Sequence, residues 1–204
     1  MIIMHHLRIG RAIFTTALLE ELSVEYELRL YDRNERFRAP PELKDAHPLG
    51  KSPVIEDKGL TIAESGAITT YLIDTYDTEG KLSPRREDRE AWVQYQQWLH
   101  YSEGSAGVPM LFNLLLGRED PKPALISAFS ARETKLHLGY MEAALEGKDY
   151  ILGDAFSGAD VGLGYVANAA RQLKLLDEYP TLKAYAKRIT SRDAFIRAFA
   201  KTGG

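Results

Sequence analysis

A change in hydrophobic pattern near residue 80 constrains the fold more than any other feature. Before it, runs with the two-residue period of a strand alternate with runs that have helical spacing. The predicted strands are 1–5, 24–31, 53–55 and 60–62, and the predicted helices are 11–22, a short one from 42, and 64–76. From Pro84 onward only helical spacing is found, in runs at 86–116, 123–146, 157–174, 180–190 and 192–201. Pro109 is expected to kink the first of these.

This order, βαβαββα and then helices alone, predicts an α/β domain followed by an all-α domain. We place the first domain at residues 1–78 and the second at 84–204. Ser157 and Asp160 have the spacing of a capping box, with Phe156 placed for a hydrophobic staple. That motif is interpreted as structural.

Composition excludes several classes of function. The chain has 204 residues, 45% of them apolar, which suffices for real cores. A net charge of −3 gives no basic excess for binding nucleic acid or an anionic membrane, so neither partner is expected. The chain has no cysteine, which removes disulfides, thiolate metal sites and a protein thiol nucleophile.

The same sequence predicts a cytoplasmic protein without a metal site. The first residues lack the basic and apolar regions of a signal peptide. The most apolar stretch, 108–116, is too short to span a bilayer. Consecutive strand residues point to opposite faces, so His5 and His6 are not expected to share a metal.

Two short segments have the chemistry of a peptide-binding site. Ser52-Pro53 precedes an apolar strand, where a cis peptide bond would turn the Ser52 N–H and C=O towards an extended ligand. The alternative is an ordinary trans proline that begins an edge strand. Glu64-Ser65 opens a helix, whose N–H groups and positive dipole end attract a carboxylate, while Glu64 could accept from an ammonium group. The alternative is simple helix capping.

Together with the domain order, these segments resemble the cytosolic glutathione S-transferases over essentially the whole chain. The most specific part is Gly50-Lys51-Ser52-Pro53-Val54-Ile55 followed by Glu64-Ser65-Gly66-Ala67-Ile68. His5-His6-Leu7 and the segment 98–105 are similar to the fungal and bacterial serine-type-like subgroup. The resemblance implies a thioredoxin-like first domain, glutathione as co-substrate and conjugation to an apolar electrophile, with peroxidase activity and a homodimer as further expectations.

The resemblance also implies roles for individual residues. Ser52, Pro53, Glu64 and Ser65 would hold the γ-glutamyl and cysteinyl parts of glutathione. Lys51 and either Arg36 or Arg38 would reach its glycine carboxylate, although exposed basic loop residues are usually only solvated. In the helical domain, a co-substrate site is expected from Tyr101, Ser105 and Phe112. Glu103 is a candidate to reach the site of a neighbouring subunit, or is a solvated surface residue.

One position departs from the family pattern. Gly10 aligns with the catalytic serine of this subgroup, and 8–13 contains no hydroxyl residue. The thiolate could be held by backbone N–H groups of Gly10 and Arg11 at the start of the first helix. Alternatively, Tyr101, Ser102 or Ser105 could supply the donor, or the chain could bind glutathione without turnover. The last reading predicts a ligand-binding or partner-recognition protein instead of an enzyme.

Overall fold

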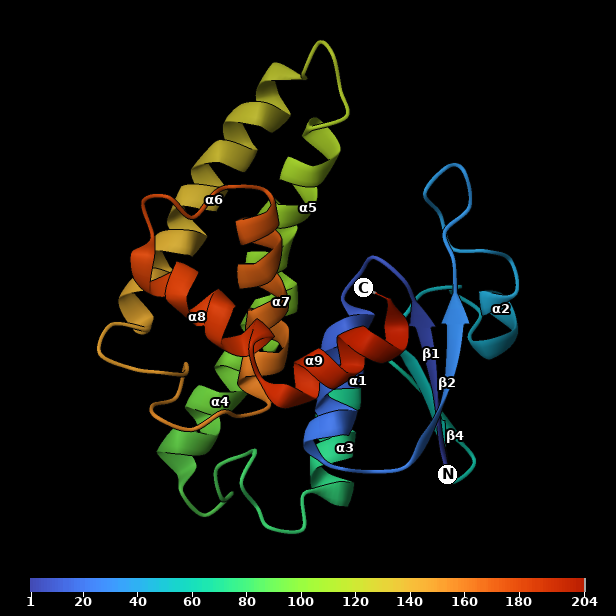
Figure 1. The fold of residues 1–204 in the computed structure, drawn as a ribbon. Helices are drawn as coiled ribbons and strands as arrows, with labels where there is room; N and C mark the ends of the chain where they lie inside the picture. Colours follow the sequence, from blue (N-terminus) through green and yellow to red (C-terminus); the bar gives the residue numbers. More distant parts are fainter. Residues whose placement is uncertain (204) are drawn as a thin grey trace. The chain divides into compact units, whose positions relative to one another are not determined.

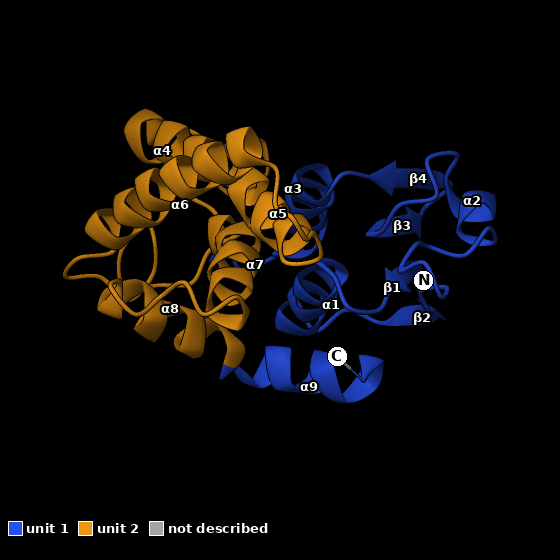
Figure 2. Cartoon of the chain, turned by 90° about the horizontal axis from the view of Figure 1, so that it is seen from above, with its two compact units in different colours: residues 1–82, 191–204 blue, residues 83–190 orange. Residues whose placement is uncertain are grey.

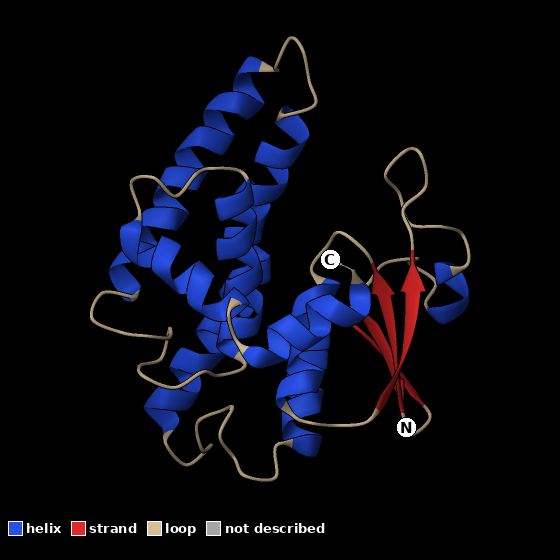
Figure 3. Cartoon of the chain, in the orientation of Figure 1, coloured by secondary structure: helices blue, strands red, loops and turns tan. Residues whose placement is uncertain are grey.

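The computed structural model describes residues 1–203, which form two compact units (Figure 2). The first unit combines Met1–Leu82 with the segment from Ser191, and the second is Ser83–Thr190. The first unit is α/β and the second contains helices, so the predicted fold class is confirmed (Figure 3).

A four-stranded sheet forms the centre of the first unit, in the order β2-β1-β3-β4 (Figure 1). Its strands are β1 (Ile2–Leu7), β2 (Tyr26–Tyr31), β3 (Val54–Asp57) and β4 (Leu60–Ala63). β1 runs parallel to β2 and antiparallel to β3. β3 and β4, which match the strands predicted at 53–55 and 60–62, pair as an antiparallel hairpin. Lys58 and Gly59 at its tip both have positive φ, as the tightest hairpin turns require.

The helices of this unit lie on both sides of the sheet. They are α1 (Ala12–Glu21), α2 (Leu43–Ala46), α3 (Ser65–Tyr76) and α9 (Asp193–Thr202). α2 lies on the opposite side of the sheet from α1 and α3 (Figure 2). α9 packs along α1, where the rings of Phe14 and Phe195 are 5.2 Å apart.

The packing of α9 affects the domain boundary and the burial of one carboxylate. The predicted second domain ran to the end of the chain, whereas the segment from Ser191 belongs to the compact first unit. Glu20 of α1 is only 8% exposed. Arg197 and Lys201 of α9 both pair with Glu20, at 3.0 and 2.5 Å. The covering helix therefore supplies the counter-charges that make this burial possible.

Six helical segments form the second unit. They are α4 (Arg89–Tyr101), the π-helical η1 (Ser102–Ala106), α5 (Gly107–Leu116), α6 (Ala124–Ala144), α7 (Ala159–Gln172) and α8 (Pro180–Thr190). The single helix predicted for 86–116 is interrupted at η1, not at Pro109 itself, which lies in the first turn of α5. Proline has no N–H and crowds the carbonyl four residues earlier, here Ser105, so the turn before it widens.

The capping-box segment is structural, but its geometry is not the usual one. The Asp160 carboxylate is buried and accepts hydrogen bonds from Ile151 N, Ser157 N, Ser157 Oγ and Tyr185 Oη. Burial raises the pKa of Asp160, and the four donors act against that rise. Asp160 thus joins the segment before α7 to α8, in addition to ordering the start of its own helix.

Residues 1–203 contain no candidate membrane span and no candidate metal cluster. None of their helices is long and apolar enough to cross a membrane. Within the same range, no three His, Asp or Glu side chains are grouped so that they could hold a metal ion.

His5 and His6 have different partners, as expected for neighbours on a strand. His5 contacts Tyr31 Oη and Glu56 Oε1, whereas the Nδ1 atom of His6 lies 2.9 Å from Thr16 Oγ1. Thr16 gives its only hydroxyl proton to the Ala12 carbonyl, so it accepts from His6 Nδ1. His6 Nε2 is therefore unprotonated, and it is buried without a hydrogen-bond partner among the described residues.

This burial predicts a loss of stability in acid. Desolvation, assisted by the Arg8 charge, lowers the pKa of His6 from 6.5 to about 4. Between these values the unfolded chain binds a proton that the folded chain does not, so the free energy of unfolding falls as the pH falls. Over the whole interval the loss from this one group is about 3 kcal/mol. Urea unfolding at a series of pH values measures it.

His6→Asn keeps a donor for Thr16 but removes the titrating ring. We expect its free energy of unfolding to vary less between pH 6.5 and 4 than that of the wild type. His100→Asn, at an exposed position on α4, is the matched control and should keep the wild-type pH dependence. Equal pH dependence in His6→Asn and the wild type would contradict the assignment.

Candidate functional site

The strand register brings four chain segments to one edge of the sheet. His5 of β1 pairs with Val54 of β3, which pairs with Ala63 of β4. Leu7 pairs with Tyr31 of β2 in the parallel sense. The residues after β1 and β2, those before β3 and those after β4 therefore all lie at this edge. They include Gly10, Arg11, Ser52, Pro53, Glu64 and Ser65, which are among the residues that the sequence predicted for the site in this unit.

Ser52 links the segment before β3 to β1. Its hydroxyl accepts from the Leu7 N–H at 3.0 Å and donates to the His5 carbonyl at 2.8 Å. The Ser52–Pro53 peptide bond is cis, which is one of the two conformations considered from the sequence. Because the hydroxyl of Ser52 is bonded to β1, any ligand contact from this residue would come from its backbone.

The start of α3 is the second part of the site. Glu64 is exposed and has a φ of 70°, a left-handed value that is uncommon for a residue with a side chain. Its carbonyl accepts the first helical bond from Ile68 N at 2.9 Å. Such conformations cost about 1–3 kcal/mol and cluster at ligand sites. After this turn, the N–H groups of the first turn of α3 point towards the N-terminal end of the helix.

The turn from β1 into α1 is the third part. Ile9 has a φ of 57° and is 64% exposed, an uncommon state for a β-branched residue. Arg11 is the N-cap of α1. Thr15 and Thr16, the first hydroxyl residues after the turn, are 1% and 0% exposed. They lie inside the unit and not at the turn.

Arg33, in the segment after β2, stabilises this turn through hydrogen bonds to its carbonyl groups. It was not among the site residues predicted from the sequence. Its Nε and Nη2 donate to the Ile9 carbonyl at 3.2 and 2.8 Å, and Nε also donates to the Arg8 carbonyl at 3.1 Å. Its Nη1 donates to the Phe37 carbonyl at 3.2 Å. A Cβ atom added to Gly10 would lie 3.2 Å from Arg33 Nη2. The guanidinium thus occupies the space beside Gly10 that a side chain would enter.

The basic loop candidates are exposed. Lys51 directly precedes Ser52 at the site edge. Arg36 lies in a turn in which Asn34 Oδ1 accepts from the backbone N–H groups of Arg36 and Arg38, each at 3.0 Å. Their positions are consistent with an anion-binding role and equally with solvation.

The candidates for a co-substrate site all lie in the second unit. Tyr101 ends α4, its hydroxyl shares a 2.7 Å hydrogen bond with His137 Nδ1, and burial raises its pKa. Phe112 of α5 packs edge-on against Phe129, with ring centres 5.8 Å apart. Glu103 and Ser105 both belong to η1. Because of its raised pKa and its bond to His137, the Tyr101 hydroxyl is protonated and already has a hydrogen-bond partner.

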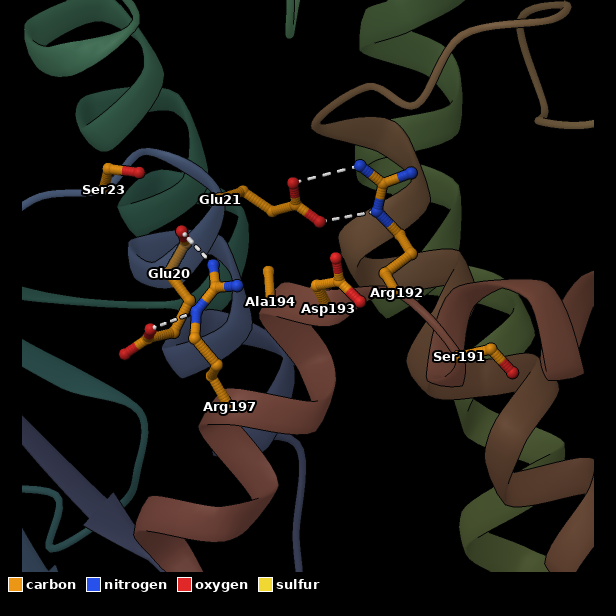
Figure 4. A pocket seen from close by; sticks show the side chains of 8 residues that line it. All are labelled: Glu20, Glu21, Ser23, Ser191, Arg192, Asp193, Ala194 and Arg197. Carbon is orange, nitrogen blue, oxygen red and sulfur yellow. Dashed lines mark hydrogen bonds and ion pairs between the residues drawn. The ribbon is translucent and has the colours of Figure 1, made fainter.

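A polar pocket in the first unit has a structural explanation. It lies between the end of α1 and the start of α9 (Figure 4). Glu21 forms two hydrogen bonds with Arg192, at 2.5 and 3.0 Å, and Arg197 bonds the carboxylate of Glu20. Burial would raise the pKa of Glu20, but bonds from Lys201, Tyr26 and Arg197 outweigh it and lower that pKa. These pairs fasten α9 to α1.

Comparison with known proteins identifies the family. The model of the glutathione S-transferase N-terminal domain matches residues 2–74, and the model of the C-terminal domain matches residues 110–202. Glutathione S-transferase 3 of Schizosaccharomyces pombe is 31% identical over 95% of this chain and 85% of its own length. The chain belongs to the glutathione S-transferase family. Glutathione S-transferase 1 of Saccharomyces cerevisiae is also 31% identical, over 94% of this chain and 91% of its own.

Solved structures agree with this assignment. A glutathione S-transferase from Actinobacillus pleuropneumoniae has a TM-score of 0.89 and 34% identity, covering 100% of this chain and 94% of that one. The glutathione S-transferase function and thioredoxin-like first unit that the sequence resemblance implied are confirmed at the level of the family. Neither comparison assigns roles to Gly10, Arg11 or the other site residues.

Proposed function

We propose that this glutathione S-transferase binds glutathione at the sheet edge of the first unit and adds its sulfur to an apolar electrophile. The observation that carries the proposal is the register, which places the Ser52 backbone, the start of α3 and the start of α1 at one edge. A tripeptide in extended form needs such a row of backbone and charged partners.

The two ends of an amino acid would be held at α3. Ser65 and the first-turn N–H groups suit the γ-glutamyl carboxylate, because the positive end of the helix dipole favours an anion. The exposed carboxylate of Glu64 suits the ammonium group. The Ser52 N–H and C=O would pair with the cysteinyl residue, and Lys51 and Arg36 would face the glycine carboxylate.

The sulfur would then lie near Gly10 and Arg11. There the N–H groups at the start of α1 donate to the thiolate. Its sulfur attacks a carbon of the electrophile, and as the carbon–sulfur bond forms, a π bond or the bond to a leaving group breaks and takes away its electron pair. A Burkholderia graminis glutathione transferase, 25% identical with a TM-score of 0.81 over 97% of this chain and 86% of that one, has two bound glutathione molecules per subunit. That likeness supports glutathione as the co-substrate here.

In the second unit, Tyr101, Ser105 and Phe112 are proposed to line the apolar co-substrate site. Reduction of an organic hydroperoxide to its alcohol and water, with two glutathione molecules oxidised to their disulfide, is part of the proposal, as is a cytoplasmic location. Catalysis without a hydroxyl side chain at position 10 departs from the pattern of the serine-type-like subgroup. Gly10 therefore supports a second candidate, a protein that binds glutathione or apolar ligands without reacting. A wild-type protein that binds glutathione but conjugates none of a panel of electrophiles would favour that candidate.

Glutathione binding is tested by calorimetry on variants at α3. Ser65→Ala and Glu64→Gln should each weaken binding about tenfold. Ser65→Ala loses a hydrogen bond to the carboxylate, worth about 1.5 kcal/mol, and Glu64→Gln keeps an acceptor for the ammonium group but loses the opposite charge. Glu25→Gln changes an exposed carboxylate elsewhere in the unit and should bind as the wild type does. Undiminished affinity in both α3 variants would refute the assignment.

A two-fold dimer is also proposed, with Glu103 reaching the γ-glutamyl group in the neighbouring subunit. Sedimentation velocity should give a dimer at micromolar concentration, and Glu103→Gln should weaken glutathione binding while the dimer persists. A stable monomer at that concentration would contradict the proposal.

A further inference from the structure

Gly10 and Arg33 form one local arrangement. The site where residue 10 would carry a Cβ atom is 3.2 Å from Arg33 Nη2, so a side chain there and this guanidinium compete for the same space. The φ of Gly10 is not in the left-handed region, so the backbone alone does not require glycine. The close approach of the Arg33 guanidinium therefore explains why glycine fits at position 10 better than a residue with a side chain.

Arg33 is held firmly at this place. Its donors reach the carbonyls of Arg8, Ile9 and Phe37, and its guanidinium carbon lies 4.7 Å from the centre of the Phe37 ring. Arg8, at the start of the same turn, bonds through Nη1 to the Asp32 carboxylate at 2.6 Å.

Three hydroxyl groups of the same unit donate to other partners. Thr16 donates to the Ala12 carbonyl, and Tyr26 donates to Glu20 at 2.5 Å. The Ser52 hydroxyl donates to the His5 carbonyl. None of these three is directed to the turn at Gly10, where the proposed function places the sulfur.

We propose that the Arg33 guanidinium, fixed beside Gly10, is the group of this chain that replaces the missing hydroxyl and stabilises the glutathione thiolate. This inference rests on the proposed function, because it requires glutathione sulfur at the Gly10–Arg11 turn. The reaction step is the ionisation of the thiol, in which the S–H proton passes to water and both bonding electrons stay on sulfur. Arg33 transfers nothing and remains protonated, as guanidinium groups do in proteins.

The size of the effect follows from charge and distance. A cation within about 4–6 Å of an acid lowers its pKa by about 1–3 units. A free thiol has a pKa of about 8.5, so a shift of that size makes much of the bound glutathione ionised at neutral pH. Lysine at position 33 would keep the charge but lose the planar fork that bonds the carbonyls.

The test is a pH titration of bound glutathione, following the ultraviolet absorbance of its thiolate. We expect Arg33→Met to raise the pKa of the bound thiol by about 1 unit or more, and to lower kcat/KM below that pKa about tenfold per unit. Arg33→Lys should keep more than half of the wild-type shift. Arg29→Met removes an exposed arginine of β2 and is the charge-matched control, with the wild-type thiol pKa.

A second pair of variants separates charge from folding. Gly10→Ala should raise the thiol pKa in the same direction by a smaller amount, because its Cβ would press on Arg33 Nη2. Gly10→Ser added to Arg33→Met should lower the thiol pKa again by restoring a hydroxyl donor. A bound-thiol pKa in Arg33→Met and Gly10→Ala equal to that of the wild type would overturn the inference and leave the proposed function intact. A wild-type protein that does not bind glutathione would overturn both.

Discussion

The Ser52 hydroxyl holds together the two segments on which the rest of the site depends. By accepting from Leu7 N–H and donating to the His5 carbonyl, it fixes the segment before β3 to the last residues of β1. The β1–α1 turn begins directly after those residues. β3 pairs with β4, and this pairing fixes the position of β4 and of the start of α3 that follows it. One side chain therefore couples the proposed positions of the sulfur and the γ-glutamyl group.

Charge pairing fixes the outer layer of the first unit in a comparable way. Glu20 is buried on α1 and would be costly there without partners. Arg197, Lys201 and Tyr26 all bond it, and Arg192 bonds its neighbour Glu21. These contacts explain why the last helix of the chain, far from α1 in sequence, is part of the first unit.

The sequence predicted those features that depend on local pattern. The strands, the β3–β4 hairpin and the helix that starts after Glu64 all follow from periodicity and turn residues within short windows. The cis bond at Ser52–Pro53 and the convergence of Ser52 with Glu64 were also anticipated, because the segments were interpreted together as parts of a family pattern. The exposed left-handed conformation of Ile9 was not.

Features that depend on distant partners were missed. Arg33 looks like an ordinary loop arginine until the parallel pairing of β1 and β2 brings it to the Ile9 carbonyl. Glu20 looks like a surface residue until α9 covers it. The kink was expected at Pro109 itself, whereas the widened turn η1 lies before the proline. The parallel β1–β2 pairing could have pointed to Arg33, because it brings the residues that follow the two strands to the same edge of the sheet.

The central claim is that glutathione lies along this edge with its sulfur at the Gly10–Arg11 turn. A crystal structure of the protein soaked with glutathione tests it most directly, through the atoms that surround the sulfur. The account predicts backbone N–H groups of residues 10 and 11 within hydrogen-bond distance, the Arg33 guanidinium nearby, and the γ-glutamyl group at the start of α3. A sulfur bonded instead to the hydroxyl of Tyr101, Ser102 or Ser105 would contradict it.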